Sequence, residues 1–191
     1  YHAGIASTLF ATTVSFGGMS LMTFASEQQR QTLLPRLVQG QARFALALTE
    51  SGAGSDAAAL SAHAQRIPEG WRIHGRKVWI SNADAADHLV VACRTTLGST
   101  GTDGISLFLV PRHTAGIHMS LLEKVGHNCM PSWDIGFDDV VVPEDALFGQ
   151  EGMGFKHVLS TLQYSRAGQA ANSIGQAQHA VELARDFAQQ R

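Results

Sequence analysis

The spacing of apolar residues changes twice along the chain and divides it into three segments. A helical spacing dominates residues 1–41, short apolar runs typical of strands cover residues 42–148, and a helical spacing returns over residues 149–191. Short strands separated by turn residues, without helices between them, favour an antiparallel barrel or sandwich. The pattern predicts an α+β protein with a helical segment, an antiparallel β-barrel or sandwich as its middle domain, and a long helix that starts a helical bundle.

The first segment contains two kinds of helix. Residues 3–25 are rich in apolar and small residues, which indicates one or two helices buried within a larger helical domain. Ser26 and Gln29 stand at the positions of a capping box before a second helix, and Gly40 is placed to end it. Pro35 lies inside this second helix and is expected to kink or break it.

The middle segment contains a series of apolar runs bounded by Gly, Pro, Asp, Ser and Thr. In the run after the turn at Pro68, the parity of Trp71 and Ile73 does not match that of Ile80. A bulge near Gly75 would reconcile the two parities. Strands are predicted at Phe44–Leu48, Ala62–Ile67, Trp71–Ile80, Leu89–Arg94, Ile105–Val110, Ile117–Leu122 and Trp133–Val142.

The last segment follows the glycine-rich run 149–154 and keeps one apolar face to the end of the chain. It predicts a helix of about 35 residues and about 50 Å. Gly168 and Gly175 each weaken a helix by about 1 kcal/mol relative to Ala, so a neighbouring helix is expected to pack closely against them.

Composition and charge exclude several classes of partner. The chain has 191 residues and a formal net charge of -2, which gives no electrostatic basis for binding nucleic acid or an anionic membrane. No apolar run reaches the ~18 residues of a membrane span, and no signal peptide is expected. Cys93 and Cys129 are interpreted as reduced, partly buried thiols of a cytoplasm-like compartment. The chain begins at Tyr1 without Met, as expected of a fragment.

The most informative stretch begins as a strand and becomes polar and glycine-rich. Residues 49–56 supply hydroxyls, carboxylates and two glycines, Gly52 and Gly54. Such a stretch offers backbone N–H groups to a phosphate or a planar polar ring, with positive φ or close approach at the glycines. The glycines also match a dinucleotide-binding motif, but no convincing helix follows them, and the acidic Glu69 lies in a hairpin turn. A dinucleotide-binding fold is therefore disfavoured.

The nine histidines do not form a metal-binding pattern. His63 and His74 are expected to face each other across a hairpin, but no third ligand has the matching parity. The pair is interpreted as solvated cross-strand neighbours, and no metal site is predicted.

Two motifs together carry a family resemblance. Residues 48–56 have the pattern Leu-Thr-Glu-x-Gly-Ala-Gly-Ser-Asp, and residues 75–82 have the pattern Gly-x-Lys-x-Trp-Ile-Ser-Asn. In this order they strongly resemble the acyl-CoA dehydrogenase family. The resemblance extends through residues 26–40, 137–143 and 152–166, and so covers nearly the whole chain.

The resemblance implies a flavin site and an acyl-CoA site. The residues expected to contact FAD are Leu46, Leu48, Thr49, Gly54, Ser55, Trp79, Ile80, Ser81 and Arg191. The residues expected to contact acyl-CoA are Ser55, Gln163, Tyr164, Ser165 and Arg166. A flavin needs an apolar slot for its ring and hydrogen-bond donors for its reduced, anionic form. The alternative for Trp79 is a core tryptophan of the β domain.

The catalytic base is the main departure from the family pattern. The resemblance implies a glutamate that removes the α-proton of the substrate while the β-hydride passes to flavin N5. That glutamate usually lies beyond the position of Arg191, and in a minority of members it immediately precedes the arginine that matches Arg166. Here Ser165 has that place, and a serine is no general base at neutral pH. Three further positions depart from the family pattern. Gln163 stands where an acidic residue is common, Ser51 stands where a proline is usual, and Ala25 stands where a glycine is usual.

These implications lead to a functional prediction. The full-length protein is expected to be an FAD-dependent acyl-CoA dehydrogenase that forms trans-2-enoyl-CoA, passes electrons to an electron-transfer flavoprotein, and assembles as a homodimer or homotetramer. A bacterial cytoplasm is favoured over a mitochondrial matrix. The alternatives are an acyl-CoA oxidase or flavin monooxygenase on the same scaffold, or a catalytically silent acyl-CoA- or flavin-binding module. The 191-residue chain alone is expected to bind FAD weakly or not at all and to lack turnover.

Overall fold

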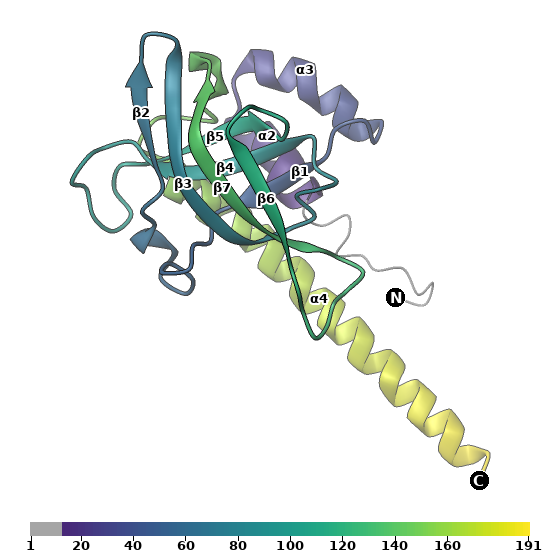
Figure 1. Ribbon diagram of the computed structural model, residues 1–191. Coiled ribbons are helices and arrows are strands. Elements are labelled where there is room, and N and C mark those ends of the chain that lie inside the picture. The colour runs from purple at the N-terminus through teal and green to yellow at the C-terminus, as the bar shows by residue number, and fades with distance from the viewer. Residues whose placement is uncertain (1–12) are drawn as a thin grey trace.

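The computed structural model describes residues 13–191, so part of the helical prediction for residues 3–25 lies outside the described residues. A helical segment precedes a curled β-sheet, and a single long helix follows the sheet (Figure 1). The helical segment consists of η1 (Thr13–Met19), a π-helical turn, then α2 (Ser20–Phe24) and α3 (Glu27–Val38). The predicted α+β succession is confirmed.

Helix α3 begins at the predicted capping box. The backbone N–H of Gln29 donates to Ser26 Oγ at 3.2 Å, and the N–H of Ser26 donates to Gln29 Oε1 at 3.1 Å. Gly40 follows the helix with a φ of 72°, a value that favours glycine. The expectation that Pro35 kinks or breaks the helix is wrong in its stronger form, because α3 continues through it. Proline removes one backbone hydrogen bond here, and the Gln39 N–H still closes the last turn on the Pro35 carbonyl at 3.1 Å.

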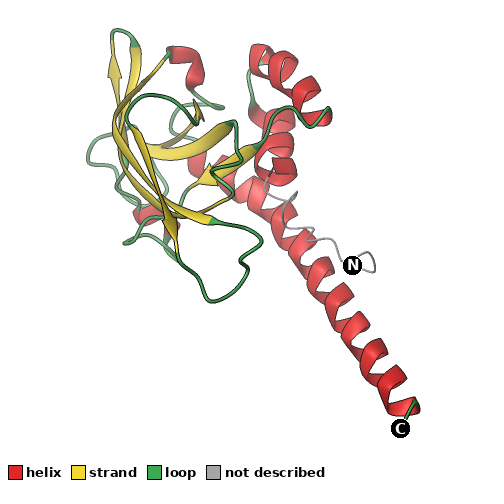
Figure 2. Cartoon of the chain, turned by 45° about the vertical axis from the view of Figure 1, so that its right-hand side comes forward, coloured by secondary structure: helices red, strands yellow, loops and turns green. Residues whose placement is uncertain are grey.

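Seven strands form one sheet, and their bounds agree closely with the predicted strands. The strands are β1 (Phe44–Ala47), β2 (His63–Ile67), β3 (Gly70–Ser81), β4 (His88–Arg94), β5 (Ile105–Pro111), β6 (Ile117–Leu122) and β7 (Ser132–Val142). The order across the sheet is β1-β4-β2-β3-β7-β6, and β5 pairs with β4 outside this path. Figure 2 shows the sheet curled into a half-barrel with helices against one side.

Most neighbouring strands are antiparallel, as predicted, but β4 differs. It pairs in parallel with β1 along four residues and with β2 at a single pair of residues. The chain reverses direction between β2 and β3 and again between β3 and β4, so β4 regains the direction of the earlier strands. No α-helix lies between β1 and β4; the described residues there contain only the short 3₁₀ turn η2 (Ala57–Ala59). The parallel pairs therefore arise from the curl of the sheet rather than from crossover helices.

The core has two parts, one on each face of the sheet. One lies inside the curl and includes Trp71, Ile73 and Phe108; the other lies between the sheet and the helices and includes Phe44 and Phe148. Strands β4 and β5 contribute to both parts and are buried almost throughout. Continuous apolar runs such as Leu89-Val90-Val91-Ala92 are typical of strands covered on both faces.

The two cysteines differ in their surroundings. Cys93 is fully buried in β4, and burial raises the pKa of its thiol to about 12, so the thiol stays protonated and unreactive. Cys129 is exposed in the loop between β6 and β7. The expectation of partly buried thiols is wrong at both positions, because residue type alone does not separate a strand covered on both faces from a loop.

Helix α4 (Gly154–Gln189) has 36 residues and extends away from the sheet (Figure 1). Beyond its first turns it leaves large apolar side chains in solvent, including Ile174 at 71% and Phe187 at 60% exposure. No described atom lies within 4 Å of a Cβ built at Gly168, so the helix expected to pack there stays a prediction. Among the helices of residues 13–191, none is long and apolar enough to cross a membrane.

Candidate functional site

The ends of β1 and β3 form the walls of a cleft of about 230 Å³. Six of the residues predicted to contact a flavin line it: Leu46, Leu48, Thr49, Trp79, Ile80 and Ser81. These residues come from two stretches, 46–49 and 79–81, which β2 and most of β3 separate in the sequence. The fold therefore brings together side chains that the sequence connects only through the family resemblance.

The first wall is the end of β1 and the residues that follow it. Leu48 is buried, while Leu46 and Thr49 are half-buried at the edge of the sheet. The backbone N–H of Val78 donates to the Thr49 carbonyl at 2.8 Å, so the chain after β1 is held directly against β3. This bond joins the two walls directly.

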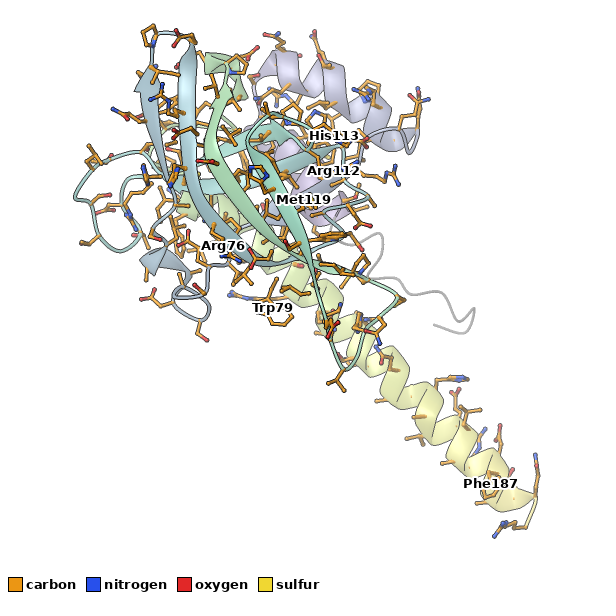
Figure 3. The ribbon with its side chains drawn as sticks, viewed as in Figure 1. Arg76, Trp79, Arg112, His113, Met119 and Phe187 are labelled. Atoms are coloured by element: carbon orange, nitrogen blue, oxygen red, sulfur yellow. The ribbon has the colours of Figure 1, made fainter. Side chains whose placement is uncertain are left out.

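The second wall owes its shape to a bulge in β3. Lys77 pairs with Ile135 of β7, whereas Ile80 pairs with Trp133, so β3 holds one extra residue at this point. Trp79 takes the extra position with a φ of 63°, a rare value for a bulky side chain. Its ring is 55% exposed and faces the cleft instead of the barrel core. Figure 3 shows Trp79 at the end of the sheet where α4 passes.

The bulge in β3 does not lie at Gly75, where the sequence had predicted it. The register does shift near Gly75, but the extra residue there belongs to β7, so the side chains of β3 keep their parity. The parity of β3 changes only at Trp79. The sequence pointed to Gly75 because glycine is the usual residue at irregular strand positions, whereas the strained residue in β3 is a tryptophan.

Two further residues close the cleft, and neither was predicted. Phe16 comes from η1 and Leu162 from α4, so the helical segments on both sides of the β domain meet at this point. Their apolar spacing marks them as helix residues facing a neighbour, but no motif identifies which neighbour that is.

A buried ion pair lies behind the first wall. Lys77 is completely buried, and its Nζ donates to Glu50 Oε1 at 2.7 Å and to the Leu48 carbonyl at 3.1 Å. Glu50 also accepts hydrogen bonds from the backbone N–H groups of Ser61 and Ala62, at 2.7 Å and 2.9 Å. The sequence did not reveal the pairing of Glu50 with Lys77.

The charge state of Glu50 follows from these contacts. Burial raises the pKa of Glu50, but the charge and hydrogen bond of Lys77, with the N–H groups of Ser61 and Ala62, outweigh it and hold the pKa below the ordinary 4.5. A carboxylate with a lowered pKa contributes stability above its ordinary pKa and loses that contribution as the pH falls through the lowered value. The ion pair is therefore intact at neutral pH.

The glycine-rich loop lies outside the cleft. Backbone bonds between Glu50 and Ala53, at 3.2 Å and 3.1 Å, close it into a tight turn. Gly54 and Ser55 are exposed beyond this turn and do not line the cleft. Neither Gly52 nor Gly54 has a positive φ, so close approach is the alternative that remains. Nothing lies within 4 Å of a Cβ built at either glycine, and both backbones are open to such an approach.

Four of the five residues predicted to contact acyl-CoA lie along α4. Gln163, Tyr164 and Arg166 are exposed, and Ser165 is half-buried, directly after the cleft residue Leu162. Arg191 lies beyond the far end of the helix, where its guanidinium is 5.1 Å from the ring of Phe187. At 1.5 Å per helical residue it is roughly 40 Å from Leu162, so this chain alone does not bring it to the cleft.

The histidine pair is confirmed as cross-strand neighbours. His63 pairs with His74, their ring centroids lie 5.7 Å apart, and both side chains are exposed. Asp139 of β7 adds a carboxylate 3.6 Å from His74 Nδ1, which the sequence did not suggest. Even so, the described residues contain no group of three or more His, Cys, Asp or Glu side chains arranged to hold a metal ion.

A larger cavity of about 430 Å³ lies between the helical segment and the start of β1. It contains none of the predicted site residues, and its one charged lining residue, Arg43, has Asp87 as an ion-pair partner at 3.8 Å. Because its lining is mainly apolar and includes none of the predicted site residues, we assign the candidate site to the smaller cleft.

Comparison with known proteins identifies the family. A sequence profile described as acyl-CoA dehydrogenase, middle domain, matches residues 45–140, which include both motifs, 48–56 and 75–82, and most of the cleft. This chain belongs to the acyl-CoA dehydrogenase family. The resemblance seen in the sequence is thereby confirmed.

Individual relatives agree with this assignment. The chain is 35% identical over 190 residues to the CarC subunit of a caffeyl-CoA reductase–Etf complex from Acetobacterium woodii. This alignment covers 99% of this chain and 50% of that protein. It is 36% identical over 193 residues to a short-chain specific acyl-CoA dehydrogenase from Megasphaera elsdenii, covering 100% of this chain and 50% of that protein. The butyryl-CoA dehydrogenase structure from the same organism superposes with a TM-score of 0.84 at 32% identity, over 88% of this chain and 44% of that one. The chain thus spans about half the length of these relatives.

Proposed function

We propose that this chain forms the flavin-binding part of an FAD-dependent acyl-CoA dehydrogenase that converts an acyl-CoA to its trans-2-enoyl-CoA. The observation that carries the proposal is the cleft, because six residues implied by the family motifs line one space of about 230 Å³. Membership of the family supports the reaction class, and the cleft supports the place of the cofactor.

The cleft suits the ring of a flavin. Its walls are mainly apolar, from Leu46, Leu48 and Ile80, while Thr49 and Ser81 add hydroxyl groups that can donate hydrogen bonds. Trp79 offers an exposed aromatic face beside them. Bound FAD would supply the acceptor for the hydride that leaves the substrate's β-carbon. Thr49, Ser81 and Trp79 would hold and orient its ring, and the apolar walls would exclude water.

Substrate and partners follow from the surfaces next to the cleft. Ser55 and the segment 163–166 of α4 are exposed and available to an acyl-CoA. The apolar residues that α4 exposes further along support packing against other helices, from this protein or from a second subunit. An electron-transfer flavoprotein is the proposed acceptor, in line with the Etf complex to which the CarC relative belongs.

The proposed reaction predicts a specific pattern of turnover. Full-length protein with FAD should reduce an artificial electron acceptor when an acyl-CoA is added without oxygen, and the product should be the 2-enoyl-CoA. A series of acyl chain lengths would define the preferred substrate. Oxygen consumption with peroxide release would instead indicate an oxidase. Incorporation of oxygen that depends on NAD(P)H would indicate a monooxygenase, and binding of acyl-CoA without turnover would indicate a silent binding module.

The 191-residue chain alone should not catalyse this reaction. No carboxylate among residues 13–191 lines the cleft, and the nearest along the sequence, Glu50, is committed to Lys77 and to backbone N–H groups. A positioned general base typically contributes ~10²–10⁴-fold to proton removal. Acceptor reduction should therefore equal the blank that contains FAD, acyl-CoA and no protein. Turnover above that blank would show that these residues include the base.

A further inference from the structure

Lys77 presents a charge where the fold would accept an apolar side chain. It follows Trp71 and Ile73 at the same parity of β3, and all three point into the barrel core. Burying an ammonium group is unfavourable unless it is paired and hydrogen-bonded, and well-packed apolar residues often replace such pairs without loss of stability. Stability of the core therefore does not explain the Lys77–Glu50 pair, whose side chains are 0% and 7% exposed.

The contacts of the pair converge on the first wall of the cleft. Lys77 Nζ donates to the carbonyl of Leu48 and to the carboxylate of Glu50, the residues on either side of Thr49. The next backbone N–H, of Val78, donates to the carbonyl of Thr49 itself. Three consecutive residues of the wall are thus bound to two consecutive residues of β3.

The second wall begins two residues after Lys77. Lys77 is the last residue of β3 in register with β7 before the bulge, and Trp79 follows it with its left-handed backbone. A strained backbone persists only where surrounding contacts over-determine it. The side chain of Lys77 provides such a contact immediately before the strained residue. Glu50 extends the network to the start of β2 through Ser61, whose N–H and Oγ both donate to Oε2 at 2.7 Å.

We propose that Lys77 and Glu50 are positioning residues that hold Thr49 and Trp79 at the spacing and orientation that the flavin ring requires. The inference rests on the proposed function of the cleft. It assigns the pair no contact with cofactor or substrate. It states that a buried charge pair, rather than apolar packing, sets the relative position of the two walls.

The test is the double variant Lys77→Met with Glu50→Gln in the full-length protein. It removes both charges, keeps similar volumes and leaves an oxygen to accept from Ser61 or Ala62. We expect an apo-protein that melts close to the wild type. After loading with FAD, its visible circular dichroism should differ from that of the wild type, and the rate of flavin reduction by substrate should fall about 100-fold, as a misplacement of about 1 Å produces.

A matched control lies one residue away. Arg76 forms a pair with Asp134 across β3 and β7, with bonds of 2.6 Å and 2.7 Å, but it faces solvent (Figure 3). The variant Arg76→Gln with Asp134→Asn also removes an ion pair made by β3 and should leave both flavin signals unchanged. If the buried double variant does not fold, Glu50→Asp keeps both charges and withdraws the carboxylate by one methylene, and it should change the same signals.

The outcomes separate the inference from the proposed function. The positioning role is overturned if the folded buried double variant has the dichroism and the flavin reduction rate of the wild type. If only Glu50→Asp folds, wild-type signals in that variant overturn it in the same way. Equal changes of the flavin signals in the buried and exposed double variants also overturn the positioning role, because the loss of either ion pair would then be enough to cause them. If wild-type protein binds no FAD, or Trp79→Ala leaves the flavin signals unchanged, the proposed function of the cleft fails and the inference fails with it.

Discussion

Replacing Trp71 with Ala should lower the free energy of unfolding by about 3–5 kcal/mol, the usual loss for a large aromatic side chain truncated in a core. Trp71 is 1% exposed inside the barrel, with the ring of Phe108 edge-on at 5.2 Å. The guanidinium of Arg66 lies 4.4 Å from the Trp71 ring centroid on the outer side. Truncation would leave a cavity that these neighbours cannot fill.

Denaturant unfolding of the FAD-free protein measures this loss. The chain is expected to remain folded at low denaturant, and any bound FAD should keep the wild-type spectrum, because Trp71 does not line the cleft. A loss below about 1 kcal/mol would contradict the assignment of Trp71 to the core, because it would be close to the effect of an ordinary surface substitution.

Replacing Trp79 with Ala should produce the opposite pattern. Trp79 belongs to the same strand, but the bulge directs its ring into the cleft, where 55% of the side chain is exposed. A ring that stacks on a planar ligand contributes roughly 1–3 kcal/mol by alanine substitution. FAD binding should therefore weaken by about 5–150-fold, and the flavin absorption bands should shift. The unfolding free energy of the FAD-free protein should change by only about 0.5 kcal/mol.

The two tryptophans serve as controls for each other. Fluorescence or absorbance titration with FAD measures binding in both variants, and denaturant unfolding measures stability in both. A Trp79→Ala protein that melts lower yet keeps stoichiometric FAD with an unchanged spectrum would favour the core alternative for Trp79. The cleft would then lose the aromatic side of its second wall.

Strand positions were predictable because the signals are local. Apolar runs such as Ile105–Val110 are bounded by turn residues, and the capping box of Ser26 and Gln29 needs only neighbouring residues. The parallel pairing of β1 with β4 was not predictable in this way, because a strand's partners depend on how the whole sheet curls. The family motifs supplied the cleft residues, but their convergence is visible only in the fold.

Lys77 shows why the rest of the site was missed. A lysine in a strand ordinarily faces solvent, and the parity it shares with Trp71 and Ile73 was the one signal of its burial. That signal was obscured because the bulge was placed at Gly75, before Lys77, instead of at Trp79, after it. Glu50 could not be recognised as its partner because the whole β2 strand and the following turn separate the two residues in sequence.

The assignment of the cleft as the flavin site is tested by the response of Trp79 itself to FAD. Full-length protein labelled with 5-fluorotryptophan gives a fluorine NMR signal for each tryptophan, and the signals of Trp79 and Trp71 are assigned by their loss in the Trp79→Phe and Trp71→Phe variants. We expect the Trp79 signal to shift on titration with FAD, with the same dissociation constant as the change in flavin absorbance, while the Trp71 signal moves little. Saturable FAD binding that leaves the Trp79 signal unmoved would contradict the assignment of the cleft as the flavin site.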